Sequence, residues 1–299
     1  MYREISGFLK MNDVEYKGNY NLSEISPIRI GPKASVVAYP NNVDKLIKLV
    51  KFLDEIKIKY KITGRMSNTL FCGDEYEGVI IRTDRIDGYT VSHNVVSVNC
   101  GAALPYISNV MCKFSLSGLE GLSGIPGSIG GAIVGNAGAF GSEIADRVVD
   151  ITCYDKESRE VVIFLARDAD FSYRHSIFKA CNLLVLSARL ALVRGDSLSI
   201  KNEMDRVRKI RTETQPVGQP SLGSTFKRPG ENLYAARLID ECGLKGFSIG
   251  GAQISKKHAG FIVNIGGATA KDYIDLSDYA KERVLDKFGV RLEREIEII

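Results

Sequence analysis

Residues 124–138 constrain the fold of this 299-residue chain more than any other segment, because six of these fifteen residues are glycines. A backbone without side chains can lie directly against a ligand, and its N–H groups can point at phosphate oxygens. The alternative is a set of tight turns that binds nothing. A dinucleotide-binding Gly-x-Gly-x-x-Gly turn does not fit, because the glycine spacing differs and Pro126 interrupts the segment. The segment therefore favours a pyrophosphate-binding turn of a different kind.

The composition is that of a globular protein of two or three domains, with 44% hydrophobic and 25% charged residues. The formal net charge is only +4, whereas a nucleic-acid-binding protein usually concentrates basic residues far more heavily. We therefore expect no nucleic-acid partner. A few lysines and arginines can still serve a small anionic substrate.

Neither a metal site nor a membrane segment is predicted. The three histidines and six cysteines form no Cys-x-x-Cys pair or other ligand cluster, and scattered cysteines indicate buried thiols in a reducing compartment. Residues 1–30 lack the apolar core of a secretory signal, and the longest apolar stretch, Leu183–Val193, is too short to span a bilayer. We expect a cytoplasmic protein without a membrane partner. The cysteines are Cys72, Cys100, Cys112, Cys153, Cys181 and Cys242.

The spacing of apolar residues predicts an α+β fold in three parts, residues 1–85, 86–195 and 196–299. The first part contains a strand–helix–strand unit, in which Asn42 caps a helix over Val43–Glu55. The second part holds short β-rich runs bounded by turns. The third part ends with a long helix over Thr269–Phe288 and an alternating strand over Val290–Ile299. The other predicted elements are strands at Ser35–Tyr39, Tyr60–Thr63, Gly78–Thr83, Val95–Cys100, Val148–Tyr154, Val161–Leu165 and Leu183–Leu192, and a charged helix at Leu198–Thr214.

Three glycine-containing blocks carry a resemblance to a known family. They read Gly118-Leu119-Glu120, Gly124-Ile125-Pro126-Gly127-Ser128-Ile129-Gly130-Gly131 and Asn136-Ala137-Gly138-Ala139-Phe140-Gly141. In this order and spacing they resemble the FAD-binding segment of the UDP-N-acetylenolpyruvoylglucosamine reductases, the MurB family. The resemblance implies a two-lobed FAD-binding domain of the vanillyl-alcohol-oxidase (PCMH) type, with FAD between residues 1–85 and 86–195, and a C-terminal α+β substrate-binding domain. The short interval between Tyr173 and Ser224 resembles the shorter subtype of the family, which lacks an extra substrate-covering loop.

A second flavin-binding block of the family is only partly kept. It reads Gly64-Arg65-Met66-Ser67-Asn68-Thr69-Leu70, with Arg65 and Met66 where relatives have glycines. Neither this block nor residues 124–138 contain histidine or cysteine, so we expect FAD to bind without a covalent link. The cofactor-binding residues that the resemblance implies are Gly64, Arg65, Ser67, Asn68, Thr69, Leu70, Gly124, Ile125, Pro126, Gly127, Ser128, Gly130, Gly131, Asn136, Ala137 and Gly138.

The resemblance implies three catalytic residues from distant parts of the chain. Arg174 lies in a Tyr-Arg-x-Ser-x-Phe block, Ser224 in a Gly-Ser-Thr-Phe block, and Glu295 in the C-terminal run of alternating acidic residues. Without the resemblance they are an ordinary surface arginine, a turn serine and a solvated carboxylate. Glu293 and Glu297 share the face of Glu295 at a period of two, so either could take its place. No Gly-x-Ser-x-Gly elbow surrounds Ser224, which argues against a hydrolase.

The implied reaction reduces the enolpyruvyl ether of UDP-N-acetylglucosamine to the lactyl ether of UDP-N-acetylmuramate, with FAD and NADPH as cofactors. Arg174 would stabilise the developing enolate, Ser224 would protonate it, and Glu295 would polarise the substrate carboxylate. Two alternatives remain open: a flavin oxidase or dehydrogenase of the same superfamily acting on another substrate, and a non-catalytic paralogue that binds flavin or nucleotide sugar. The implied substrate-binding residues are Lys227, Arg228, Gln253, Lys257 and His258.

Overall fold

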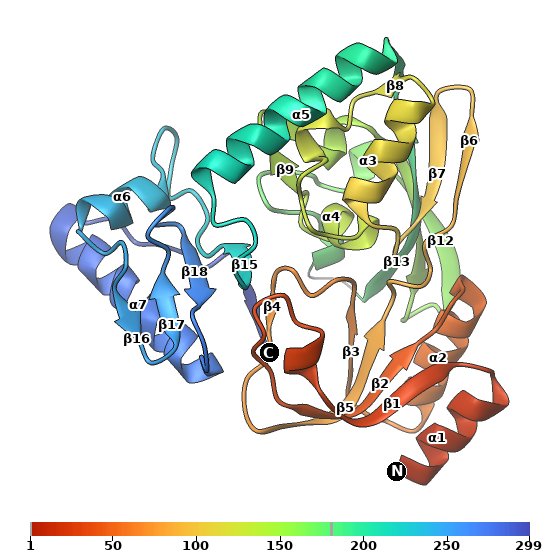
Figure 1. Cartoon of the computed structure of the whole chain (residues 1–299). Coiled ribbons are helices and arrows are strands. Elements are labelled where there is room, and N and C mark those ends of the chain that lie inside the picture. Colours follow the sequence, from red (N-terminus) through yellow and green to blue (C-terminus); the bar gives the residue numbers. More distant parts are fainter. Residues whose placement is uncertain (1, 180–181) are drawn as a thin grey trace. The chain divides into compact units, whose positions relative to one another are not determined.

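The computed structural model describes residues 2–179 and 182–299, which form two compact units (Figure 1). Unit 1 comprises Met1–Gly18, Val36–Arg65 and Gly78–Ile210, and unit 2 comprises Asn19–Ser35, Met66–Glu77 and Arg211–Ile299. Each unit has its own hydrophobic core. Unit 1 contains residues from all three parts predicted from the sequence. That residues 1–85 and 86–195 form two FAD-binding lobes stays a prediction. Within the described ranges, no helix is long and apolar enough to cross a membrane.

The first sheet has four strands in the order β1-β2-β5-β3, and most of its residues belong to unit 1. Strands β3 and β5 run parallel, with Tyr60 opposite Val79. Helices α1 and α2 turn their apolar sides toward the unit 1 core, where the rings of Phe8 and Phe52 stack with centroids 4.0 Å apart. The elements are α1 (Tyr2–Met11), β1 (Glu15–Asn21), β2 (Lys33–Tyr39), α2 (Val43–Glu55), β3 (Tyr60–Thr63) and β5 (Glu75–Arg82).

The second sheet of unit 1 has five antiparallel strands in the order β12-β11-β13-β7-β6. The short helix α4, which carries part of the glycine-rich segment, packs against β13. The elements are β6 (Tyr89–Ser92), β7 (Val95–Asn99), α3 (Leu104–Lys113), β8 (Leu116–Ser117), α4 (Ile129–Val134), β9 (Gly138–Ala139), β10 (Ser142–Glu143), β11 (Val148–Asp155), β12 (Glu160–Leu165), β13 (Leu183–Ala191), β14 (Val193–Arg194) and α5 (Ser197–Thr214).

Unit 2 is built on a four-stranded antiparallel sheet in the order β15-β18-β17-β16, with helix α7 packed on β16 and β17 (Figure 1). Thr269 and Asp272 form a reciprocal capping box at the start of α7, and Gly289 ends the helix with φ 67°. The elements are β4 (Thr69–Leu70), β15 (Ser221–Ser224), α6 (Ala235–Glu241), β16 (Ser248–Ile249), β17 (Ala252–Ile254), β18 (Phe261–Asn264), α7 (Ala270–Phe288) and β19 (Glu297–Ile298).

Most of the predicted helices and strands are confirmed. The helix over Val43–Glu55 is α2, and the Asn42 side chain accepts a hydrogen bond from the Lys45 N–H at 2.9 Å, as its predicted cap role requires. The long strand predicted over Val290–Ile299 is wrong. Only β19 and one isolated bridge, Phe226 to Arg294, are formed there, because the segment pairs first with residues 225–227 and then with β4.

The end of α2 allows a stability prediction. Lys57 follows the helix with φ 54°, a left-handed conformation that costs side-chain-bearing residues energy and that glycine adopts freely. Its N–H donates to the Asp54 carbonyl at 3.2 Å, as in a helix-terminating turn. We expect Lys57→Gly to raise the free energy of unfolding by about 0.5–1 kcal/mol. Denaturant unfolding measures this effect, and Lys48→Gly, an exposed site inside the same helix, should instead lower stability.

Candidate functional site

The glycine-rich segment forms a tight turn that leads into α4 in unit 1. The Ser128 side chain caps this helix and accepts a hydrogen bond from the Gly131 N–H at 3.3 Å. Gly130 donates its N–H to the Cys100 carbonyl at 2.8 Å, and a Cβ on Gly130 would lie 2.9 Å from the Cys100 Cβ. A Cβ on Gly64 would lie 2.2 Å from the Ser128 Oγ. The fold therefore brings Gly64 against the 124–131 block, and both positions need glycine for this close approach.

Parts of this turn expose backbone rather than side chains. Gly124 and Gly127 are half-buried, and Gly131 is exposed although it lies in a helix. Without a Cβ, such residues offer N–H and carbonyl groups directly to a ligand. The turn and the adjoining Gly64 therefore fit a non-covalently bound FAD whose pyrophosphate lies on the backbone.

The two residues that replace family glycines differ in conformation. Met66 has φ 55° and is buried, so it keeps a backbone conformation that favours glycine. Arg65 has no such φ and its side chain is exposed. Arg65 therefore places a positive charge where an anionic group can reach it, whereas Met66 is a buried, uncharged side chain.

Residues Ser67 to Leu70 belong to unit 2 and attach to the C-terminal segment. Asn68 donates from its Nδ2 to the Glu295 carbonyl at 3.1 Å and accepts from the Glu297 N–H at 3.0 Å. Leu70 pairs with Ile298 in the parallel β4–β19 ladder. The predicted flavin block is thus hydrogen-bonded to the segment that carries the predicted catalytic carboxylate.

Arg174 occupies the turn of a small hairpin in unit 1, closed by an isolated bridge between Ser172 and His175. Its φ is 56°, an unusual value for a residue with a long side chain, and such conformations concentrate at functional sites. The guanidinium donates to the Gly138 carbonyl at 3.0 Å and to the Asn136 carbonyl at 3.5 Å. The segment predicted to bind flavin therefore holds Arg174 in place.

The Arg174 hairpin is anchored by buried polar groups. Ser176 is fully buried and donates from its Oγ to the Val134 carbonyl at the end of α4, at 2.8 Å. The buried Asn136 side chain donates to Glu143 at 2.8 Å and to the Ser172 carbonyl at 2.9 Å. Since Asn136 is fully buried and its amide is engaged within the protein, it can contact a flavin only after rearrangement.

Ser224 and Glu295 lie on hydrogen-bonded neighbouring segments of unit 2. Ser224 ends β15, follows Gly223 with φ 81° and is exposed. The next residue, Thr225, accepts a hydrogen bond at its carbonyl from the Glu295 N–H at 2.9 Å. Glu295 is half-buried, whereas Glu293 and Glu297 are exposed. Burial thus separates Glu295 from the two alternative carboxylates.

The predicted substrate-binding residues all lie in unit 2, and each makes a polar or cation–π contact there. Lys227 forms an ion pair with Glu293, and Lys257 donates to the Thr212 carbonyl. Gln253 donates to the Gly246 carbonyl at 3.1 Å, and Arg228 lies over the Tyr234 ring at 5.3 Å.

His258 is the remaining one of these residues. Its Nδ1 accepts from the Gly260 N–H at 3.2 Å. Partial burial lowers the pKa of His258 below its usual value, so the ring is neutral at pH 7 and can donate from Nε2.

Arg174 belongs to unit 1, whereas Ser224 and Glu295 belong to unit 2. The meeting of all three at one flavin stays a prediction. Within unit 2, the sequence did not single out Tyr273, which contacts Thr225 next to Ser224, or Arg294, which lies next to Glu295 and contacts helix α7. No local pattern marks them, because their partners lie far away along the chain.

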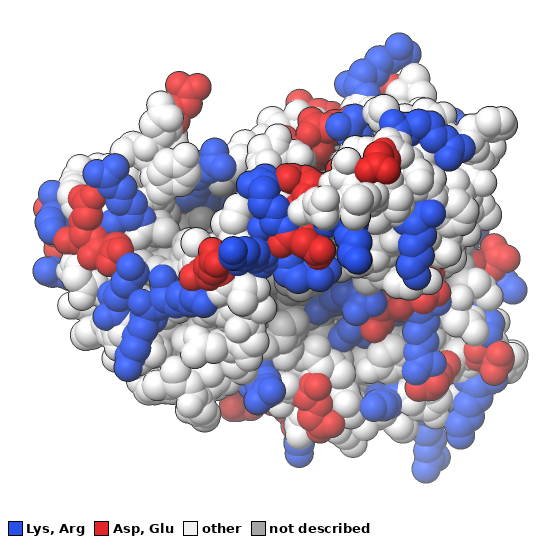
Figure 2. Space-filling view, turned by 45° about the horizontal axis from the view of Figure 1, so that its top comes forward, with Lys and Arg blue, Asp and Glu red and all other residues white. Residues whose placement is uncertain are grey.

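Lys and Arg stand interspersed with Asp and Glu on the face in Figure 2. Among the described residues, no group of three or more His, Cys, Asp or Glu side chains could hold a metal ion. Burial raises the pKa of Cys100 and of Cys153 to about 12, which keeps both thiols protonated. Cys181 lies outside the described residues.

Comparison with known proteins first defines the class. Residues 34–163 match the family model of an FAD binding domain. The chain also shares its fold, at a TM-score of 0.50 and 11% identity over 97% of its length and 60% of the other chain, with the glucooligosaccharide oxidase of Acremonium strictum. The molecule therefore has an FAD-binding domain and an α+β fold of the PCMH type.

Its C-terminal part and its near relatives narrow the class to one family. Residues 215–299 match the family model of the UDP-N-acetylenolpyruvoylglucosamine reductase C-terminal domain. The UDP-N-acetylenolpyruvoylglucosamine reductases of Caldanaerobacter subterraneus subsp. tengcongensis and Fervidobacterium nodosum are 40% and 39% identical to it, covering 97% and 94% of this chain and 97% and 90% of their own lengths. The crystal structure of the Thermus caldophilus enzyme (MurB) has a TM-score of 0.80 at 30% identity, with 95% of this chain and 98% of that one covered. The chain belongs to the UDP-N-acetylenolpyruvoylglucosamine reductase (MurB) family, in its shorter subtype.

Proposed function

We propose that this protein reduces UDP-N-acetylglucosamine enolpyruvate to UDP-N-acetylmuramate in the cytoplasm, using NADPH. The reaction supplies a precursor of peptidoglycan, so it serves cell-wall synthesis, cell shape and cell division. The observation that carries the proposal is the near-complete coverage by relatives bearing this name, at 40% and 39% identity. The substrate is a small nucleotide sugar, which needs neither a nucleic acid nor a membrane.

Bound FAD would supply the hydride chemistry, with NADPH as the reductant and the substrate double bond as the acceptor. Gly64, the turn over residues 124–131, and Ser67 to Leu70 would hold the cofactor. The turn over residues 124–131 can bind the pyrophosphate without a charged side chain, because its backbone N–H groups can donate to the phosphate oxygens. Arg65 would add an accessible cation next to it.

Three side chains would handle the charge and the proton of the substrate. Hydride addition places negative charge on the carbon next to the carboxylate, and a preorganised cation stabilises such charge most. Arg174 would supply it, since two backbone carbonyls already orient its guanidinium. Ser224 would donate the proton, and the half-buried Glu295 would polarise the substrate carboxylate.

Cations of unit 2 would bind the anionic parts of the substrate. Lys227 and Arg228 follow Ser224 by three and four residues and are suited to a diphosphate or carboxylate. Gln253, Lys257 and the neutral His258 would form the wall of the same site. Because Lys227 is paired with Glu293, we expect the substrate to compete with that carboxylate for the ammonium.

A direct assay tests the function. Purified protein loaded with FAD is mixed with NADPH, with and without the enolpyruvyl nucleotide sugar, and absorbance of NADPH and flavin is followed. We expect sustained NADPH oxidation only when the nucleotide sugar is present. NADPH consumption with oxygen alone indicates a flavin oxidase instead. Protein that stays colourless after addition of FAD contradicts the assignment of a flavoenzyme.

A further inference from the structure

The C-terminal segment that carries Glu295 is not held by a regular sheet. Its backbone bonds on this side are few: the Lys227 N–H donates to the Glu293 carbonyl and the Glu295 N–H to the Thr225 carbonyl, both at 2.9 Å. An isolated bridge joins Phe226 to Arg294 between them. On its other side the segment bonds to Asn68, which donates to the Glu295 carbonyl and accepts from the Glu297 N–H. These bonds fix the backbone, and side-chain contacts add to the orientation of the segment.

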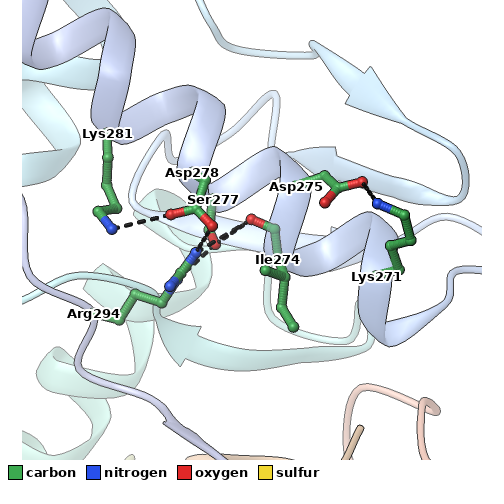
Figure 3. Close-up of polar contacts among 7 residues, drawn as sticks. All are labelled: Lys271, Ile274, Asp275, Ser277, Asp278, Lys281 and Arg294. Atoms are coloured by element: carbon green, nitrogen blue, oxygen red, sulfur yellow. Dashed lines mark hydrogen bonds and ion pairs between the residues drawn. The ribbon is translucent and has the colours of Figure 1, made fainter. Parts of the chain in front are cut away.

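Arg294 provides such an anchor on helix α7. Its Nε donates to the Ser277 Oγ at 2.7 Å, and its guanidinium also reaches the Ile274 carbonyl at 3.3 Å and Asp278 at 2.5 Å (Figure 3). Ser277 is fully buried and the Arg294 side chain is only 19% exposed. The rigid fork of an arginine therefore meets three acceptors within one turn of the helix, which defines a single orientation.

Asp278 is charged in this arrangement. Burial acts to raise its pKa, but hydrogen bonds from Arg294 and Lys281 lower the pKa below its usual value. Lys281 lies 3.0 Å from the same carboxylate (Figure 3). The anchor is therefore the ion pair of Arg294 with Asp278, supported by the neutral acceptors Ser277 and Ile274. Hydrogen bonds between charged groups are stronger than those between neutral groups.

The alternating direction of side chains along the segment relates the position of Arg294 to that of Glu295. In extended backbone, successive side chains point to opposite sides. Leu292 and Ile296 are buried in the unit 2 core and Arg294 is fixed to α7, whereas Glu293 and Glu297 are exposed. Holding Arg294 on α7 thus directs Glu295 to the other side of the segment.

The segment that carries Ser224 has a second anchor on the same helix. The Thr225 Oγ1 lies 3.1 Å from the Tyr273 hydroxyl, and both residues are fully buried. Tyr273 precedes Ser277 by one helical turn. Thr225 and Arg294, the residues next to Ser224 and Glu295, are therefore attached to neighbouring turns of α7, and the Glu295 N–H also donates to the Thr225 carbonyl.

We infer that helix α7 positions Ser224 and Glu295 for the reaction, through the Tyr273–Thr225 contact and the contacts of Arg294 with Ser277 and Asp278. This inference rests on the proposed function. Neither Arg294 nor Tyr273 touches substrate; each acts on the residue beside it. Misplacing a reacting group by a small distance slows a reaction without abolishing binding.

The test compares Asp278→Asn with a matched change on the same helix, Asp275→Asn. Asp275 forms an exposed pair with Lys271 at 2.6 Å and does not touch Arg294 (Figure 3). Each variant is loaded with FAD, and stopped-flow absorbance separates flavin reduction by NADPH from reoxidation by the enolpyruvyl nucleotide sugar. We expect Asp278→Asn to slow reoxidation by about 10- to 100-fold, with flavin reduction unchanged. Asp275→Asn should leave both half-reactions unchanged.

Two further variants keep the inference testable if Asp278→Asn folds poorly. Arg294→Lys keeps a charge for Asp278 but cannot also reach Ser277 and Ile274, and Tyr273→Phe removes one hydroxyl. Both should slow reoxidation alone, by less than Asp278→Asn. Equal behaviour of Asp278→Asn and Asp275→Asn, or equal slowing of both half-reactions, overturns the inference while the function stands. Wild-type protein that is not reoxidised by the nucleotide sugar overturns both.

Discussion

Ser224→Ala is expected to retain flavin reduction by NADPH and to lose most of its reoxidation by the nucleotide sugar. The serine hydroxyl is a weak acid, but the enolate left by hydride transfer is a strong base, and short-range transfer in a closed site is feasible. Removing a positioned proton donor costs about 10²- to 10⁴-fold in rate. Stopped-flow measurement of the two half-reactions shows which one changes.

The geometry of Ser224 makes this a clean substitution. Its side chain is exposed, so alanine creates no cavity in the core of unit 2. Its strand partner is Phe261, and neither backbone bond of Thr225 depends on the Ser224 hydroxyl. Ser221→Ala, on the same strand, is the matched control and should change neither half-reaction. An equal loss in both half-reactions of Ser224→Ala would speak against a proton-donor role.

Local signals in the sequence were sufficient for many elements. Helix α2 was predictable because a capping asparagine precedes apolar residues at helical spacing, and the Asn42 cap is indeed formed. Helix α4 was not predicted as a helix, because its glycines disfavour helical structure in isolation. It forms because Ser128 caps it and the turn packs against Cys100.

Only those residues of the site that lie in recognisable sequence motifs could be predicted. Blocks around Gly64 and Gly124 could be matched to a family, and the structure brings Gly64 and Ser128 together. Alternation alone could not separate Glu295 from Glu293, whereas burial and the bond to Thr225 do. The anchors on α7 stayed hidden because Arg294 and Tyr273 meet partners 16 to 48 residues away, and no sequence period records such contacts.

Arg174→Lys is expected to keep FAD binding and flavin reduction but to slow reoxidation by the nucleotide sugar about 10²- to 10³-fold, the usual cost of removing an oriented group that stabilises developing negative charge. Lysine keeps the charge and loses the planar fork. In this hairpin, the fork reaches the carbonyls of Gly138 and Asn136, which orient it. A lysine ammonium cannot hold both carbonyls and grip a carboxylate at two points.

The backbone of Arg174 separates this effect from simple unfolding. Its φ of 56° is already costly for any residue except glycine, so lysine adds no new backbone strain. Arg167→Lys, an exposed arginine paired with Asp168 in the same unit, is the control and should behave as wild type. If Arg174→Lys matches this control in reoxidation, the guanidinium stabilises no charge on the substrate. A larger loss of reoxidation rate in Arg174→Lys than in Ser224→Ala would show that charge stabilisation contributes more to the rate than proton donation. This order is reasonable because the enolate must form before it can be protonated.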